Sequence, residues 1–213
     1  GREVIDWDVV SQKWGHSVSH SICRGCEVVW RQHKPVSPHE KADNTVEYFV
    51  LASLPGLASL WGRGALDFKA MSADDVELAT RYACRELNGF PEWFPQLLAQ
   101  RADEVGRTLM LAIAGEWEYP GDRQHVHGVL STLVWHDIDT PKIAPGVMEL
   151  LVKGDPKNQQ MLGYALDFIM KDTAGRAFVS VLAPGRESAI APASAPWFLW
   201  VSAWLRVDGV AAL

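Results

Sequence analysis

The stretch Trp135-His-Asp-Ile-Asp139 decides the fold of this chain, because it recurs as Trp204-Leu-Arg-Val-Asp208 and, more weakly, as Phe168-Ile-Met-Lys-Asp172. Successive copies are 33 and 36 residues apart. In each copy we expect the aromatic residue in the last turn of one helix and the Asp, four residues later, as the cap of the next helix. An interval of this length fits one pair of antiparallel helices.

Such helix pairs bury their apolar faces by stacking on neighbouring pairs. The sequence therefore predicts an all-α fold of stacked antiparallel helix pairs, either an α-solenoid of the HEAT or TPR type or an irregular helical bundle. A chance recurrence is the alternative, since an aromatic residue and an Asp four positions apart are common.

Helical patterns continue outside the repeat. Ser72 followed by Asp75 has the spacing of a capping box and predicts a helix through Leu87, ended by Asn88-Gly89-Phe90-Pro91, with another helix starting near Pro91. Apolar stripes at helical spacing predict further helices over 105–117, 143–151 and 161–169.

Two segments are expected to be irregular. Residues 31–43 form the longest polar stretch and contain two prolines, so we predict an exposed loop there. Residues 183–196 contain three prolines and Gly185, and we predict an irregular connection between two helices. Neither segment is long enough for a domain linker, and we expect residues 1–213 to form a single helical-repeat domain.

The composition excludes several classes of protein. The 213 residues are 48% hydrophobic and include ten Trp, which is ordinary for a globular chain apart from the surplus of tryptophan. The formal net charge of −6 argues against nucleic acid as a partner. Three cysteines cannot build a disulfide framework and indicate the reducing cytoplasm. The most apolar stretches, 48–61 and 195–205, are shorter than the roughly 18 apolar residues of a membrane span, so we expect no membrane partner.

The two ends suggest a piece of a larger protein. The chain begins at Gly1 without an initiator Met and ends at Leu213, inside what resembles a newly started helix, Val210-Ala-Ala-Leu213. We therefore interpret it as a fragment of a longer multidomain protein.

The first candidate metal ligands are His16, His20, Cys23 and Cys26, because two imidazoles and two thiolates suit zinc. On one straight helix these residues would spread over about 15 Å, given a rise of ~1.5 Å per residue. Zinc ligands all lie about 2.3 Å or less from one point, so a single helix cannot close the site. Buried core thiols are the favoured interpretation.

A turn at Gly25 would change that geometry, since zinc sites with the Cys-x-x-Cys spacing lie on tight turns and take other ligands from elsewhere. His33 or His39 could then contribute. A redox role for the cysteines would require a preceding strand, and none is predicted.

His125 and His127, with His136 further along, are the second group of metal-ligand residues. Gly128-Val129-Leu130 follow where a hydrolytic metal centre would have Asp and His, which favours a polar loop before a helix. Glu116 and Glu118 flank Trp117 and could face a cleft, although paired acids beside an aromatic residue usually lie on a solvated helix edge. The sequence contains none of the common catalytic or phosphate-binding motifs, so we predict no catalytic residue and no cofactor.

Trp197, Trp200 and Trp204 lie at i, i+3 and i+7 on a helix that Pro196 can begin. Aromatic stripes of this kind are usually buried between helices. The alternative is an interface with a partner protein or with the rest of the parent chain, and the two interpretations are compatible.

The segment Arg85-Glu86-Leu87-Asn88-Gly89-Phe90-Pro91-Glu92-Trp93-Phe94, within 79–94, resembles part of the C-terminal helical-repeat region of large bacterial NACHT-type (STAND) NTPases. The Trp-x-x-x-Asp stretches at Trp135 and Trp204 are similar to that region too, so the resemblance spans residues 45–213. In that superfamily an effector and a central ATPase precede a repeat-rich sensor, often in antiviral defence. The phosphate loop is absent here, so the resemblance carries over no nucleotide-binding residue and implies a sensor or scaffold.

The sequence thus favours a non-catalytic helical-repeat module for protein recognition or intramolecular regulation. Its partner would be another protein or the rest of the parent chain. The alternative is a small metal-dependent enzyme that uses His125, His127 and His136, or a zinc-binding domain at Cys23 and Cys26.

Overall fold

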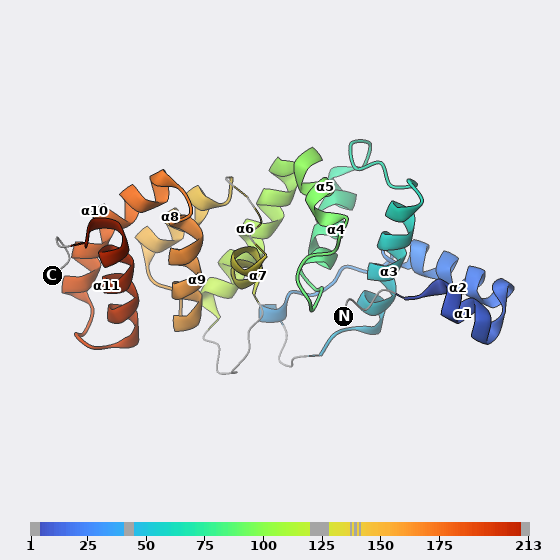
Figure 1. Ribbon diagram of the computed structural model, residues 1–213, viewed down its shortest axis with the longest axis horizontal. Helices are drawn as coiled ribbons and strands as arrows, with labels where there is room; N and C mark the ends of the chain where they lie inside the picture. The colour runs from blue at the N-terminus through green and yellow to red at the C-terminus, as the bar shows by residue number, and fades with distance from the viewer. Residues whose placement is uncertain are drawn as a thin grey trace. The chain divides into compact units, whose positions relative to one another are not determined.

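The computed structural model describes residues 5–40, 45–119, 128–136, 138, 140 and 142–209. Within these residues the fold is all-helical and contains no strand (Figure 1). The helices are α1 (Trp7–Trp14), α2 (His16–Val29), α3 (Tyr48–Gly62), α4 (Ala73–Ala83), α5 (Phe94–Gln100), α6 (Ala102–Glu118), α7 (Val129–Trp135), α8 (Ala144–Lys153), α9 (Gln159–Ile169), α10 (Thr173–Ala189) and α11 (Ala195–Asp208), with a 3-10 turn at Pro38–Glu40. The all-α class predicted from the sequence is confirmed. No helix in the described ranges has the length and apolar character required to cross a membrane.

The chain divides into two compact units, residues 1–109 and residues 110–213, with the division inside α6. Each unit has its own apolar core. The largest buried side chains of the first unit are Trp30, Phe68, Tyr82, Trp93 and Phe94, and those of the second include Leu130, Leu133 and Trp200. The single domain expected over residues 1–213 stays a prediction.

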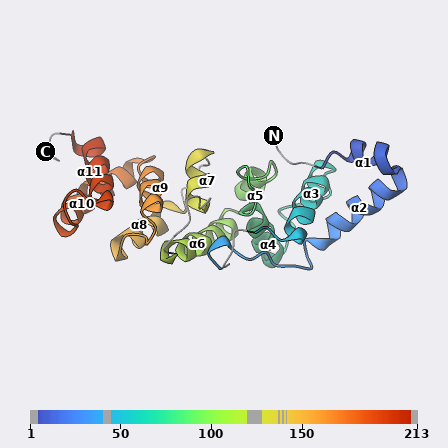
Figure 2. The ribbon, with the colours of Figure 1, turned by 90° about the horizontal axis from the view of Figure 1, so that it is seen from below.

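In the first unit, α2 and α3 pack closely and antiparallel (Figure 2). A Cβ atom on Gly56 would lie 2.1 Å from the carbonyl oxygen of Cys26, so only glycine permits this approach. The Cys23 Sγ lies 3.3 Å from the Ser59 Oγ. The helix α3 continues through Pro55, which is buried inside it, although proline normally costs about 3 kcal/mol within a helix. The packing of this strongly apolar helix outweighs that cost.

In the second unit, α10 and α11 lie side by side in both views (Figures 1 and 2). The Ser180 hydroxyl donates to the Asp208 carboxylate, and the Trp197 indole donates to Glu187 over 3.2 Å. Because Ser180, in the middle of α10, meets the end of α11 and Glu187, near the end of α10, meets its start, the two helices are antiparallel.

The prediction of an irregular connection over residues 183–196 is partly wrong. The helix α10 includes Pro184 and continues to Ala189, so that only the residues before Ala195 link it to α11. Ala183 and Val179 are fully buried on the face of α10 that packs inward, and this burial holds the helix together beyond the proline.

The repeated aromatic and Asp pattern has a different outcome in each copy. Phe168 lies in the last turn of α9, and Asp172 caps α10 by accepting a hydrogen bond from the Gly175 N–H at 2.6 Å, as predicted. Trp135 ends α7, whereas Asp139 is outside the described residues. Asp208 is the last residue of α11, and its carboxylate accepts from the Trp204 indole at 2.9 Å; the helix that it was expected to cap lies outside the described residues.

The helix ends around α4 follow the predicted chemistry only in part. The Ser72 hydroxyl accepts a hydrogen bond from the Asp75 N–H at 3.1 Å, which confirms the predicted start. The helix then ends at Ala83 rather than Leu87, because the Leu87 side chain is exposed and gains no burial from a longer helix. The next helix, α5, starts at Phe94.

Candidate functional site

The first group of candidate metal ligands lies along one regular helix. His16, His20, Cys23 and Cys26 all belong to α2, and Gly25 lies inside that helix rather than in a turn. The His16 Nδ1 is 2.6 Å from the Ser11 hydroxyl. In the described part of the chain, no three His, Cys, Asp or Glu side chains are arranged to hold a metal ion.

The structure describes only some of the other histidines that the sequence offered as metal ligands. His125 and His127 lie outside the described residues. His136 is the exposed C-cap residue of α7. His33 stacks on the Phe49 ring at 4.7 Å, and burial lowers the pKa of His39, which favours its neutral form.

A buried carboxylate that the sequence analysis did not single out joins α2 to α3. The Glu27 side chain is only 2% exposed. It accepts hydrogen bonds from the Ser59 hydroxyl at 3.0 Å, from Arg24 at 3.0 Å and from Arg63. Burial alone would raise the pKa of Glu27, but the hydrogen bonds from Ser59 and Cys23 and the charge of Arg63 outweigh it and lower that pKa. The site is therefore a satisfied ion cluster.

The Cys26 thiol beside this carboxylate is a poor nucleophile. Burial raises the pKa of Cys26, and the neighbouring Cys23 and Glu27 raise it further. Because the thiolate is the reactive form of cysteine, this environment disfavours nucleophilic chemistry at Cys26.

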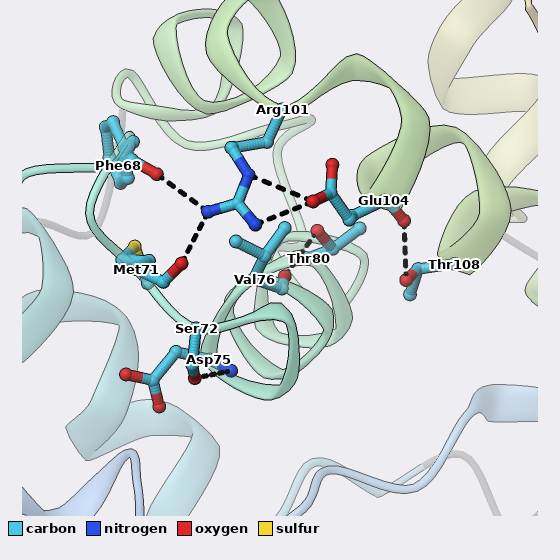
Figure 3. Close-up of polar contacts among 9 residues, drawn as sticks. All are labelled: Phe68, Met71, Ser72, Asp75, Val76, Thr80, Arg101, Glu104 and Thr108. Carbon is cyan, nitrogen blue, oxygen red and sulfur yellow. Dashed lines mark hydrogen bonds and ion pairs between the residues drawn. The ribbon is translucent and has the colours of Figure 1, made fainter.

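A second polar network of the first unit centres on Arg101 (Figure 3). Its guanidinium donates to the carbonyl oxygen of Phe68 at 3.1 Å and to that of Met71, and it holds the Glu104 carboxylate at 2.6 Å. The figure also shows the Thr108 hydroxyl donating to the Glu104 carbonyl oxygen, at 3.0 Å. These partners are backbone and side-chain groups of one unit. Arg101 therefore attaches the segment that precedes α4 to the start of α6.

The tryptophan stripe of α11 is mostly part of the core. Trp200 is fully buried, and its indole N–H donates to Asp155 at 3.1 Å. Trp197 and Trp204 are half-buried, and their indoles donate to carboxylates of the same unit. The large exposed side chain of this helix is Phe198, which stacks edge-on against Trp197 at 5.1 Å.

The helix α2 also has an exposed face without charge. We call it the uncharged face of α2, and it consists of Val18, Ser21, Ile22, Gly25 and Val28. Its apolar side chains are between 41% and 52% exposed, and a Cβ atom on Gly25 would meet no atom within 4 Å. Their spacing of three and four residues places them on one side of the helix, opposite the buried Glu27, and the buried Cys26, four residues after Ile22, borders this face. This is the arrangement of a surface that packs against another helix.

Glu116 and Glu118 do not share the solvated helix edge that the sequence favoured. Glu118 is exposed and pairs with Lys157 at 3.0 Å. Glu116 is only 5% exposed, and both of its carboxyl oxygens lie 3.1 Å from the Val129 N–H. Desolvation raises the pKa of Glu116 to about 8, against the opposite effect of that hydrogen bond.

Simple sequence signals could have found both buried acids. Glu116 continues the apolar stripe of Val105, Leu109 and Ile113, which places it on the buried side of α6. Glu27 lies four residues after Cys23 and next to Cys26, on the side of α2 that the thiols mark as buried.

The segment that carries the resemblance to NACHT-type NTPases forms the connection from α4 to α5. Trp93 and Phe94 are fully buried, and Phe90 stacks on Phe94 at 4.2 Å. Arg85 pairs with Glu47 at 3.6 Å. These residues build a turn and its packing.

No protein-family model matches this chain, and no curated protein or solved structure is significantly similar to it.

Proposed function

We propose that this chain is a non-catalytic helical module that recognises another protein through the uncharged face of α2. The observation that supports the proposal is the two-sided character of this helix. The side of α2 that carries Glu27 packs into the first unit, whereas the opposite side exposes Val18, Ile22 and Val28. Burying exposed apolar area stabilises a complex by about 25 cal/mol per Å² before the costs of association.

The chemistry of this face suggests an amphipathic helix as the partner element. Side chains spaced by three and four residues are the anchors by which helices dock in grooves and bundles. The open position at Gly25 would allow a partner backbone to approach closely, since glycine has no Cβ atom.

The wider setting is also part of the proposal. The resemblance of residues 85–94 supports a role as the sensor or scaffold part of a larger bacterial signalling or defence NTPase, where the partner could equally be the rest of the parent chain. Cys23 and Cys26 carry thiols rather than a disulfide, which supports a cytoplasmic location.

Site-specific photo-crosslinking tests the proposal. A photoreactive amino acid at position 22 is expected to crosslink one specific protein in cells, whereas the same group at Val181, which is 83% exposed on α10, is expected not to. With that partner purified, Val18→Ser combined with Ile22→Ser is expected to raise Kd at least tenfold in titration calorimetry. The matched control Val181→Ser is expected to leave Kd unchanged.

Two outcomes would contradict the proposal. Equal loss of binding in the α2 variant and the Val181 control would remove the role of this face. Saturable, stoichiometric binding of ATP or Zn²⁺ to the purified chain would instead favour a catalytic or zinc-binding protein, and elemental analysis of the same sample would identify a resident metal.

A further inference from the structure

The buried acid Glu116 joins two helices of the second unit at the point where the chain returns from α6 to α7. Its carboxyl group lies against the start of α7, with the Val129 N–H 3.1 Å from each oxygen. A Cβ atom on Gly128 would lie 2.7 Å from one of these oxygens, so the backbone packs directly on the carboxyl group. Among the described residues, this N–H is the hydrogen-bond donor to Glu116.

The charged groups of the neighbouring helices do not compensate a charge on Glu116. On α6 the ionisable side chain closest to Glu116 in sequence is Glu118, which is exposed and paired with Lys157. The residues of α7 carry no ionisable side chain, and Glu149 and Lys153 of α8 are exposed. Between α6 and α7 the sequence also contains Asp122, Arg123, His125 and His127, which lie outside the described residues.

We propose that Glu116 is a pH-sensitive contact that holds the start of α7 on α6 in its protonated form and releases it after losing the proton. The proton goes to solvent, and the carboxylate that remains is more stable in water than in this buried position. Release of α7 would expose the buried residues that start this helix, Val129 and Leu130.

The direction of the pH dependence follows from proton linkage. Burial holds the pKa of Glu116 at about 8 when the contact is closed, whereas a glutamate in water has its ordinary pKa of 4.5. Because the closed state binds the proton more tightly, the contact is strongest below the solvated pKa and is lost as pH rises through about 8. Over this interval the opening equilibrium should increase about tenfold per pH unit.

Two measurements on the full chain test this inference. Amide hydrogen exchange should show protection factors for 129–135 that fall about tenfold per pH unit between pH 5 and 8, once intrinsic exchange rates are divided out. The ¹³C resonance of the Glu116 carboxyl should titrate with a midpoint near 8.

Glu116→Gln is expected to abolish the pH dependence of protection, because the amide keeps an oxygen for the Val129 N–H and does not titrate. The neighbouring Glu118→Gln is expected to retain the full dependence. A Glu116 carboxyl that titrates with a midpoint near 4.5 would overturn the inference, whether solvent or a positively charged partner keeps it ionised. This measurement uses the wild-type chain, so it decides the question even if Glu116→Gln fails to fold. Persistence of the dependence in a folded Glu116→Gln chain would overturn it too.

Discussion

Two buried glutamates, one in each unit, respond to burial in opposite ways. Glu27 joins α2 to α3 and has a lowered pKa, whereas Glu116 joins α6 to α7 and has a pKa raised to about 8. Both are almost completely removed from solvent. The number and charge of the donors around each carboxyl group therefore determine its state, and burial alone does not.

The difference has a structural origin in the neighbouring helices. Around Glu27, two arginines extend from the surface and Ser59 donates from the facing helix. At Glu116 the described donor is one backbone N–H. The first carboxylate gains enough interaction to stay ionised in a dry position, and the second does not.

Removing the donors of Glu27 should make it behave like Glu116. In the double variant Ser59→Ala with Arg63→Ala, the buried carboxylate loses a hydrogen bond and a charge partner, and we expect a loss of about 3 kcal/mol in the free energy of unfolding at pH 7. Denaturant unfolding followed by circular dichroism measures this change.

The pH dependence of this variant should reverse. In the wild type the lowered pKa of Glu27 gives stability that is present above its solvated pKa and is lost as pH falls through the lower folded pKa. The double variant should instead gain stability as the pH falls and Glu27 becomes protonated. The exposed Lys69→Ala serves as the control for a lost positive charge, and an unchanged acid limb in the double variant would show that Arg24 alone suffices.

Glycine-to-alanine substitutions compare how tightly the backbone packs where α2 meets α3 and where α6 meets α7. Gly56→Ala places a Cβ atom against the Cys26 carbonyl oxygen, which is backbone and cannot rotate away. We expect a loss of about 2 kcal/mol, as for other cases of overpacking. Gly25→Ala on the partner helix is the matched control, because it meets open space and should stabilise α2 by roughly 0.5 to 1 kcal/mol. A smaller cost for Gly56→Ala than for Gly128→Ala would contradict the rigid packing of α2 on α3.

Where α6 meets α7, Gly128→Ala should lower the free energy of unfolding by less, about 1 kcal/mol, because its Cβ atom meets the side chain of Glu116 rather than backbone. The backbone at Gly128 has an extended conformation that alanine also adopts, so the contact with Glu116 is the source of the cost. A double-mutant cycle with Glu116→Ala should show that this cost disappears when the side chain is shortened. Additive effects would locate the cost elsewhere.

Much of the fold was predictable because it rests on local rules. Two helix caps involve residues only three positions apart, Ser72 with Asp75 and Asp172 with Gly175, and both hydrogen bonds are present as expected. The rule failed where tertiary packing overrides local preference. The helix α10 continues through Pro184, because Val179 and Ala183 on its inward face are fully buried.

The candidate sites were less predictable, because they depend on which side of a helix faces the core. The sequence left open whether Cys23 and Cys26 lie on one helix or on a turn at Gly25, and it could not reveal that Ser59, 36 residues beyond Cys23, would lie against that thiol. It assigned Glu116 to a solvated edge from the identity of its neighbours, whereas its position in the stripe of α6 decides its burial. Identifying which donors meet a buried acid requires the packing of helices distant in sequence.

The smallest expected effect separates the two arginines of Glu27. Arg24 lies three residues before Glu27 on the same helix, and its side chain is 58% exposed. Arg63 directly follows α3, and its side chain is 52% exposed. Because Arg24 is held only by a short-range pair on its own helix and is screened by solvent, Arg24→Ala should change the free energy of unfolding by less than about 0.5 kcal/mol. Arg63→Ala should cost more, since this residue also ties α2 to the end of α3. Denaturant unfolding at two salt concentrations measures both, and equal costs would mean that the charge of the cluster, rather than the link between the helices, keeps Glu27 ionised.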